Sequence, residues 1–122
     1  MNLVDSFGWL EYFADGKNAK AFAPAIEDTK NLIVPTICLY EVFKRVLQQK
    51  NENEAVEAIG LMHQATVIDL DMTLSLNAAR LSYDLKLPMA DSIILATAKA
   101  YHAIVWTQDT DFKNLEGVKF IL

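Results

Sequence analysis

The chain has 122 residues, of which 52% are apolar and 22% are charged, and its net charge is −5. This length suits one domain with one core, and the apolar content excludes a disordered chain. No apolar run approaches the roughly 20 residues that a membrane span needs. The acidic balance argues against a general nucleic-acid binder, whose surface would be rich in Lys and Arg.

The N-terminus and the single cysteine bear on location. The first residues have no basic start and place Asp5 where a signal peptide would be apolar, so we expect no targeting segment. Cys38 lies among apolar neighbours and has no partner for an internal disulfide. Together these features predict a reducing, cytoplasmic location, with Cys38 as a buried structural thiol.

The chain opens with a short apolar run over residues 3–4, which predicts a strand ending at Asp5. A helical stretch follows to about Phe13, and a second helix is expected over residues 18–30. The β-branched run at residues 32–34 predicts the next strand, because the following proline would stop it.

Two helices in the middle of the chain have recognisable starts. Thr36 is expected to cap a helix whose apolar residues recur at helical spacing: Leu39, Val42, Phe43, Val46 and Leu47. After a helix over residues 53–64 and a strand over 66–68, Asp71 is expected to cap the next helix. That helix carries one apolar stripe: Leu74, Ala78, Leu81 and Leu85.

The last third of the chain begins with a segment that is apolar almost all round. It covers residues 89–98 and predicts a central, buried helix. A strand over 103–107, a turn opening a short helix over 108–112 and an edge strand over 118–122 complete the pattern. Strands alternating with helices predict a parallel sheet covered on both faces, an α/β sandwich whose sites lie beyond the carboxyl ends of the strands.

Asp91 is the acid that is hardest to explain by structure alone. On its helix it shares a face with three apolar residues: Ile94, Leu95 and Ala98. An ionised carboxylate on such a stripe is costly unless it is paired or binds a metal. The alternative is an ordinary acid of the first turn after Pro88, stabilised by free N–H groups and the helix dipole. The rarity of unpaired buried carboxylates favours a function.

Each of the other acids also has an ordinary structural explanation. Asp5 can be a helix N-cap, and Asp109 with Asp111 can form a capped turn. Glu41 can pair with Arg45 one turn later on the polar face of its helix. What favours a site is that all of these acids fit one end of one sheet, where clustered carboxylates need a compensating charge, usually a divalent metal.

Other kinds of site find little support. His63 and His102 share no metal-ligand spacing, and no Gly-rich phosphate loop is present. Phosphate contacts in a nucleic-acid complex would have to come from scattered cations: Lys44, Arg45, Arg80, Lys86, Lys99 or Lys113.

Four segments carry a family resemblance: residues 3–6, 35–42, 88–98 and 106–112. With them the chain resembles a PIN domain and, at this length, a VapC-type toxin of a toxin–antitoxin pair. The resemblance spans the whole chain. It implies a single PIN domain over residues 1–122, built as a three-layer α/β/α sandwich with a short central parallel sheet.

The resemblance also implies the roles of individual residues. Four acids match the catalytic positions of the family: Asp5, Glu41, Asp91 and Asp109. Three residues match supporting positions: Thr107, Asp111 and Ser6. A Mg²⁺ or Mn²⁺ cofactor would be held by Asp5, Asp91 and Asp109, and Glu41 would orient or deprotonate the attacking water. Gln108 departs from the family, because many relatives carry a basic residue there.

The activity implied is metal-dependent cleavage of single-stranded RNA. The family further implies a homodimer and a cognate antitoxin that lays an Arg- or Lys-bearing segment over the acidic groove. Two alternatives remain at this point. One is a receiver-like regulatory domain, which is also acidic and binds Mg²⁺ through Asp. The other is a non-catalytic PIN-like interaction module.

Overall fold

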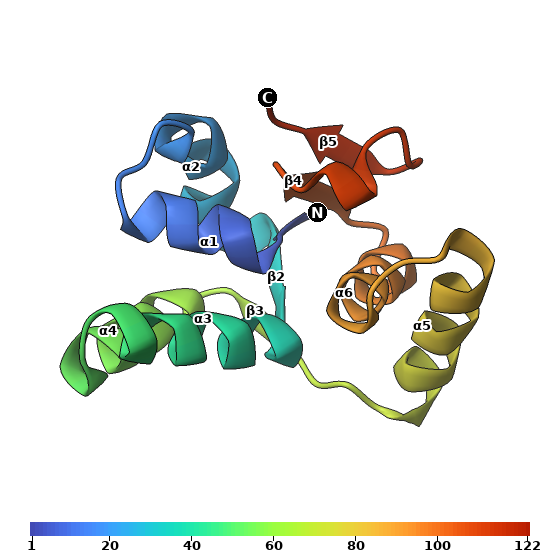
Figure 1. The fold of residues 1–122 in the computed structure, drawn as a ribbon, viewed down its shortest axis with the longest axis horizontal. Helices are drawn as coiled ribbons and strands as arrows, with labels where there is room; N and C mark the ends of the chain where they lie inside the picture. Colours follow the sequence, from blue (N-terminus) through green and yellow to red (C-terminus); the bar gives the residue numbers. More distant parts are fainter.

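Five parallel strands form the centre of the fold, in the order β3-β2-β1-β4-β5 (Figure 1). The computed structural model describes all of residues 1–122. The strands are short: β1 (Asn2–Val4), β2 (Leu32–Pro35), β3 (Thr66–Ile68), β4 (Ile104–Thr107) and β5 (Val118–Phe120). Every neighbouring pair is parallel, as the alternation of strands and helices predicts.

Six helices cover the sheet: α1 (Ser6–Phe13), α2 (Ala19–Glu27), α3 (Thr36–Gln49), α4 (Glu52–Met62), α5 (Met72–Leu85) and α6 (Met89–Ala100). In Figure 1, α1 to α4 gather to the left of the central strands and α5 with α6 to the right. The expected three-layer α/β/α sandwich is therefore confirmed. None of the helices combines the length and the apolar content needed to cross a membrane.

Helix α6 is the central helix that its apolar sequence predicts. Seven consecutive residues, from Ser92 to Ala98, are buried. The two polar side chains in this run form hydrogen bonds within the helix: Ser92 Oγ donates to the Met89 carbonyl and Thr97 Oγ1 donates to the Ile93 carbonyl. Such local bonds let a helix enter the core without leaving unpaired polar groups.

Several boundaries differ from the sequence prediction. Strand β2 includes Pro35, which was expected to stop it, and α4 ends at Met62 instead of residue 64. The helix expected over residues 18–30 ends at Glu27, because Asp28 leaves the helical conformation and a 3₁₀ turn, Thr29–Asn31, follows. Thr36 does not cap α3: the N-cap is Pro35, whose extended backbone leads into a helix without a side-chain cap. The last strand ends at Phe120 instead of residue 122. The Asp71 cap of α5 is confirmed, with Oδ1 accepting from the Leu74 N–H at 2.8 Å.

The strand order fixes where a site can form. From the central β1 the chain proceeds first to β2 and β3 on one side, and then to β4 and β5 on the other. Val4 at the end of β1 lies in register with Trp106 of β4, so the carboxyl ends of these two strands open side by side. This is the switch point at which parallel sheets hold ligands. The order also differs from the flavodoxin-like order of receiver domains, so the receiver-like alternative is wrong.

Candidate active site

Asp5 directly follows β1, and each of its two carboxylate oxygens accepts a hydrogen bond from a different residue. Oδ1 accepts a hydrogen bond from the Gly8 N–H at 2.8 Å, which makes Asp5 the N-cap of α1. Oδ2 accepts from Thr107 Oγ1 at 2.5 Å. The side chain is only 1% exposed. The capping explanation for Asp5 is therefore correct, but it accounts for only one of the two oxygens.

Thr107, the last residue of β4, connects Asp5 to the loop that follows the strand. Its hydroxyl donates to Asp5 and accepts from the Asp109 N–H at 2.9 Å. The residue is fully buried. One hydroxyl thus fixes the positions of two acids that follow different strands.

Glu41 faces the same site from α3. Its Oε1 accepts a hydrogen bond from Ser6 Oγ at 2.6 Å, and Ser6 is the first residue of α1. The ion pair with Arg45 that could have explained Glu41 does not form, since no nitrogen of Arg45 lies within 4.0 Å of the carboxylate. The Ser6 contact ties Glu41 to the residue next to Asp5.

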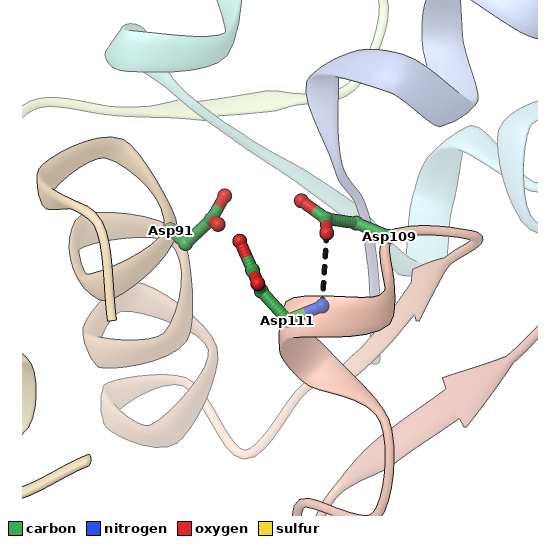
Figure 2. A group of neighbouring side chains, drawn as sticks. All are labelled: Asp91, Asp109 and Asp111. Carbon is green, nitrogen blue, oxygen red and sulfur yellow. Dashed lines mark hydrogen bonds between the residues drawn. The ribbon is translucent and has the colours of Figure 1, made fainter. Parts of the chain in front are cut away.

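Three acids make the tightest group at this edge (Figure 2). Asp91 projects from the first turn of α6 toward Asp109 and Asp111, which come from the loop after β4. Each offers an oxygen, and these atoms all lie within 4.8 Å of one another. Asp109 Oδ1 also accepts from the Asp111 N–H at 2.9 Å, so the loop is held in the form that presents both acids.

The electrostatics of the cluster favour a bound cation. Burial raises the pKa of Asp5 from 3.8 to about 6 although its hydrogen bonds with Thr107 and Gly8 oppose that change, and the charges of Asp109 and Glu41 add to it. Burial likewise raises the pKa of Asp91 from 3.8 to about 7, with further increases from the other acids of the site. Carboxylates that raise one another's pKa lack a compensating positive charge.

The raised pKa of Asp91 favours the functional explanation of this residue over the structural one. An acid stabilised by the N-terminus of its helix would have a lowered pKa, because free N–H groups and the dipole favour the ionised form. The pKa of Asp91 is instead raised. Asp91 does lie in the first turn of α6, but burial and the neighbouring acids raise its pKa.

All the site residues predicted from sequence lie at this one edge: Asp5, Ser6, Glu41, Asp91, Thr107, Asp109 and Asp111. The tightest group, however, contains Asp111 in place of Asp5 from the expected metal set. Asp5 lies next to that group, joined to it through Thr107. Five carboxylates converge here, and carboxylate oxygens are the ligands that hard divalent cations prefer, so the residues present fit Mg²⁺ or Mn²⁺.

Sequence reasoning missed Gly8 and did not anticipate the contact that Gln108 makes. Gly8 supplies the N–H that binds Asp5, and a Cβ there would lie 2.6 Å from Val4 Cγ1 and 3.0 Å from Asp5 Oδ1, so no larger residue fits. Gln108 accepts from Asn18 Nδ2 at 2.8 Å and thereby joins the loop after β4 to the start of α2. A glycine three residues after an acidic cap is the signal that could have revealed the first.

Cys38 is a buried thiol beneath this edge, as expected. Burial raises its pKa, and the nearby acids Asp5, Glu41 and Asp91 raise it further. The group therefore stays protonated and neutral, which suits a packing residue beside a cluster of negative charge.

The Thr107 hydroxyl is open to a direct test. Thr107→Val keeps the shape of the side chain but leaves the partly buried Asp109 N–H and one oxygen of the buried Asp5 without their partner. We expect a loss of stability of about 1–3 kcal/mol, measured by urea unfolding. Thr107→Ser, which keeps the hydroxyl, should retain most of the stability. Equal behaviour of the two variants would contradict the role of the hydroxyl.

Comparisons with known proteins agree with this fold. The model of the PIN domain family matches residues 3–118. Among solved structures, a toxin–antitoxin complex from Klebsiella pneumoniae aligns with a TM-score of 0.81 at 23% identity, covering 98% of this chain and 96% of the other. VapC20 of Mycobacterium tuberculosis, described as a toxin that cleaves the sarcin–ricin loop, aligns with a TM-score of 0.78 at 13% identity, covering 99% and 97%. FitAcB from Neisseria gonorrhoeae aligns with a TM-score of 0.73 at 22% identity, covering 91% and 89%. No curated protein sequence matches the chain.

Proposed function

Since this chain belongs to the PIN domain family, we propose that it is a metal-dependent endoribonuclease, a single domain that hydrolyses phosphodiester bonds in single-stranded RNA. The observation that carries the proposal is the convergence of five carboxylates at the carboxyl ends of β1 and β4, with the pKa of two of them raised. An uncompensated acid cluster costs stability, and a function that needs a divalent cation explains why it is present.

The metal would be held first by Asp91 and Asp109, with Asp111 and Asp5 as the further donors that the cluster offers. Mg²⁺ and Mn²⁺ both suit these oxygens. A bound ion of this kind supplies positive charge that stabilises the pentacovalent phosphate and lowers the pKa of water.

The remaining residues position the reacting groups. Ser6 occupies one oxygen of Glu41, which leaves the other oxygen free to accept a proton from the attacking water. Thr107 holds Asp5 and the Asp109 backbone in a fixed relation, so the acids do not need to reorganise when substrate binds. Asp109, in turn, orders the backbone at Asp111.

The proposal extends to a toxin role in the cytoplasm. One structurally similar protein is described as a toxin–antitoxin complex, and two others, VapBC2 from Rickettsia felis and VapBC from Salmonella typhimurium, are described as bound to DNA. An antitoxin segment that carries Arg or Lys would find complementary charge at the acid cluster, and charge-assisted bonds to carboxylates are strong. The unpaired Cys38 thiol fits a reducing compartment. The acidity of the chain, net −5, suits such a partner.

The proposal also includes a homodimer, for which α5 offers a face. Helix α5 packs chiefly against α6 and leaves three large apolar side chains exposed on one stripe: Met72 (78%), Leu76 (65%) and Tyr83 (82%). Arg80 and Asp84 border the stripe with opposite charges. A two-fold axis places the same patch on both copies, so a mixed border of this kind is self-complementary.

Leu76→Asp tests the dimer. A charge in the middle of the stripe should convert a dimer into a monomer, because an unpaired carboxylate would be buried between the two copies. Light scattering coupled to gel filtration measures the mass directly. Val56→Asp, which alters an equally exposed apolar residue of α4, should leave the mass unchanged. A monomer before mutation, or a dimer that survives Leu76→Asp, would exclude this face.

The nuclease proposal is tested with purified protein and end-labelled RNA. We expect cleavage of a single-stranded RNA in Mn²⁺ or Mg²⁺ and none in EDTA, with a perfectly paired duplex of the same sequence cut at least tenfold more slowly. Products are resolved on a denaturing gel. Cleavage that is equally fast in EDTA would point to a contaminating metal-independent ribonuclease and would refute the proposal for this chain.

A further inference from the structure

A second polar surface adjoins the acid cluster and is not used by it. Between the start of α1 and the outer face of α3 lies a hollow of about 340 Å³. Ser6 and Glu41, which are hydrogen-bonded to each other, line the side of the hollow that faces the acid cluster. Away from that boundary the hollow is lined by groups of a different kind: Phe7, Tyr40, Lys44 and Arg45.

The two aromatic residues of the hollow are unusually exposed. Phe7 is 56% exposed and Tyr40 is 61% exposed. Neither belongs to the buried core, although Trp9 and Phe22 on the neighbouring turns of α1 and α2 are almost fully buried. Exposed aromatic faces beside a charged groove are the surface on which unpaired bases stack.

The two cations have no carboxylate partner that would occupy them. Lys44 places Nζ 5.8 Å from the centre of the Tyr40 ring. Arg45 lies one helical turn from Glu41, yet that acid bonds to Ser6 instead. Both side chains are exposed. They therefore place two positive charges in the hollow that Ser6 and Glu41 border, next to acids that would otherwise repel every phosphate.

We call this hollow, with its residues Phe7, Tyr40, Lys44 and Arg45, the α1–α3 groove. We propose that it binds the single-stranded RNA on one side of the bond to be cut. Lys44 and Arg45 contact backbone phosphates, and Phe7 and Tyr40 each stack on a base. The inference rests on the proposed nuclease function and adds to it the path by which substrate reaches the acids. It would also reconcile RNA binding with a net charge of −5, because Lys44 and Arg45 line the same hollow as Glu41.

Equilibrium binding in EDTA separates this inference from the nuclease proposal, because no cleavage or metal is involved. The probe is a fluorescein-labelled, mixed-sequence single-stranded RNA, followed by anisotropy at several salt concentrations. The double variant Lys44→Ala with Arg45→Ala should bind at least tenfold more weakly, and its salt slope should fall by about 0.7 for each phosphate that the variant no longer neutralises. The matched control removes two exposed lysines at the opposite, amino-end edge of the sheet, Lys30 and Lys99, and should change affinity less than twofold.

The aromatic residues make a separate prediction. Phe7→Ala and Tyr40→Ala should each weaken binding roughly tenfold while leaving the salt slope unchanged, because stacking releases no counterions. Tyr40→Phe should bind normally and Tyr40→Leu should not, since a ring face is needed rather than apolar bulk. Circular dichroism confirms that the exposed substitutions keep the fold.

The outcomes distinguish the two proposals. Weakened binding by the groove variants in EDTA supports the groove even if the protein fails to cut RNA in Mn²⁺, and that failure would count against the nuclease alone. Affinity and salt slope within twofold of the unaltered protein would overturn the groove. Equal affinity for a labelled polyglutamate peptide would also overturn it, because the surface would then be a site for acidic protein segments.

Discussion

Asp91→Asn is expected to slow metal-dependent cleavage of single-stranded RNA by on the order of 10³-fold or more. A metal ion contributes several kcal/mol of charge stabilisation to such a transition state, and each 1.36 kcal/mol corresponds to a factor of ten in rate. Asparagine keeps the size of the side chain and removes the charge that holds the ion. No side chain or backbone group donates a hydrogen bond to the Asp91 carboxylate, so the substitution should leave the fold intact.

Asp5→Asn should cause a similar loss of rate, but the two variants differ in their effect on structure. Asp5 accepts from both Gly8 and Thr107, and an amide nitrogen in place of Oδ2 cannot accept from the Thr107 hydroxyl. Asp28→Asn alters an exposed acid at the amino-end edge of the sheet and serves as the control, with an unchanged rate. Undiminished cleavage by both site variants would remove the assignment of this cluster as the active site.

The metal-free protein is expected to lose stability as the pH rises from about 4 to 8. The folded protein holds protons on Asp5 and Asp91 up to about pH 6 and 7, whereas the unfolded chain has released them near 3.8. Because the folded state binds more protons in this window, its free energy of unfolding falls with increasing pH. For Asp5 the change corresponds to roughly 3 kcal/mol, and the more exposed Asp91 adds less because solvent screens it.

Thermal unfolding in EDTA measures this effect. A domain of this size should unfold about 10 °C lower at pH 8 than at pH 5. Saturating Mn²⁺ should restore much of the loss at pH 8, since a ligand at 100 times its Kd adds about 2.7 kcal/mol. Asp91→Asn should make the pH dependence shallower, whereas Asp28→Asn should not. A midpoint that rises from pH 5 to 8 in EDTA would show that the acids are compensated without a metal.

Most helices and strands could be predicted from the sequence because the patterns that indicate them are local. The apolar segment that predicts α6 and the Asp71 cap of α5 each depend on residues within or next to one helix, and the structure contains both features. The helix ends that were missed depend on the wider fold. Helix α2 ends before Asp28, and a 3₁₀ turn then leads into β2. Pro35 occupies the N-cap position of α3 that Thr36 was expected to fill.

The acids of the site could be predicted from the sequence, but the contacts between them could not. Alternating strands and helices indicate that Asp5 and Asp109 share an edge, and the apolar stripe marks Asp91 as anomalous. No local pattern shows that Thr107 joins Asp5 to Asp109, that Ser6 takes Glu41 away from Arg45, or that Asp111 belongs to the tightest group. The Ser6–Glu41 contact joins residues 35 apart in sequence, and the Asp5–Thr107 contact joins residues 102 apart, which the pairing of β1 with β4 brings together.

Titration of Mn²⁺ into the metal-free protein by calorimetry at pH 7.5 tests the central claim most directly, because every proposed role of the acid cluster requires a bound cation. We expect saturable binding to the unaltered protein and to Asp28→Asn, and at least tenfold weaker binding to Asp91→Asn. Absence of Mn²⁺ and Mg²⁺ binding to a correctly folded protein would contradict the account and would identify the chain as a non-catalytic PIN module.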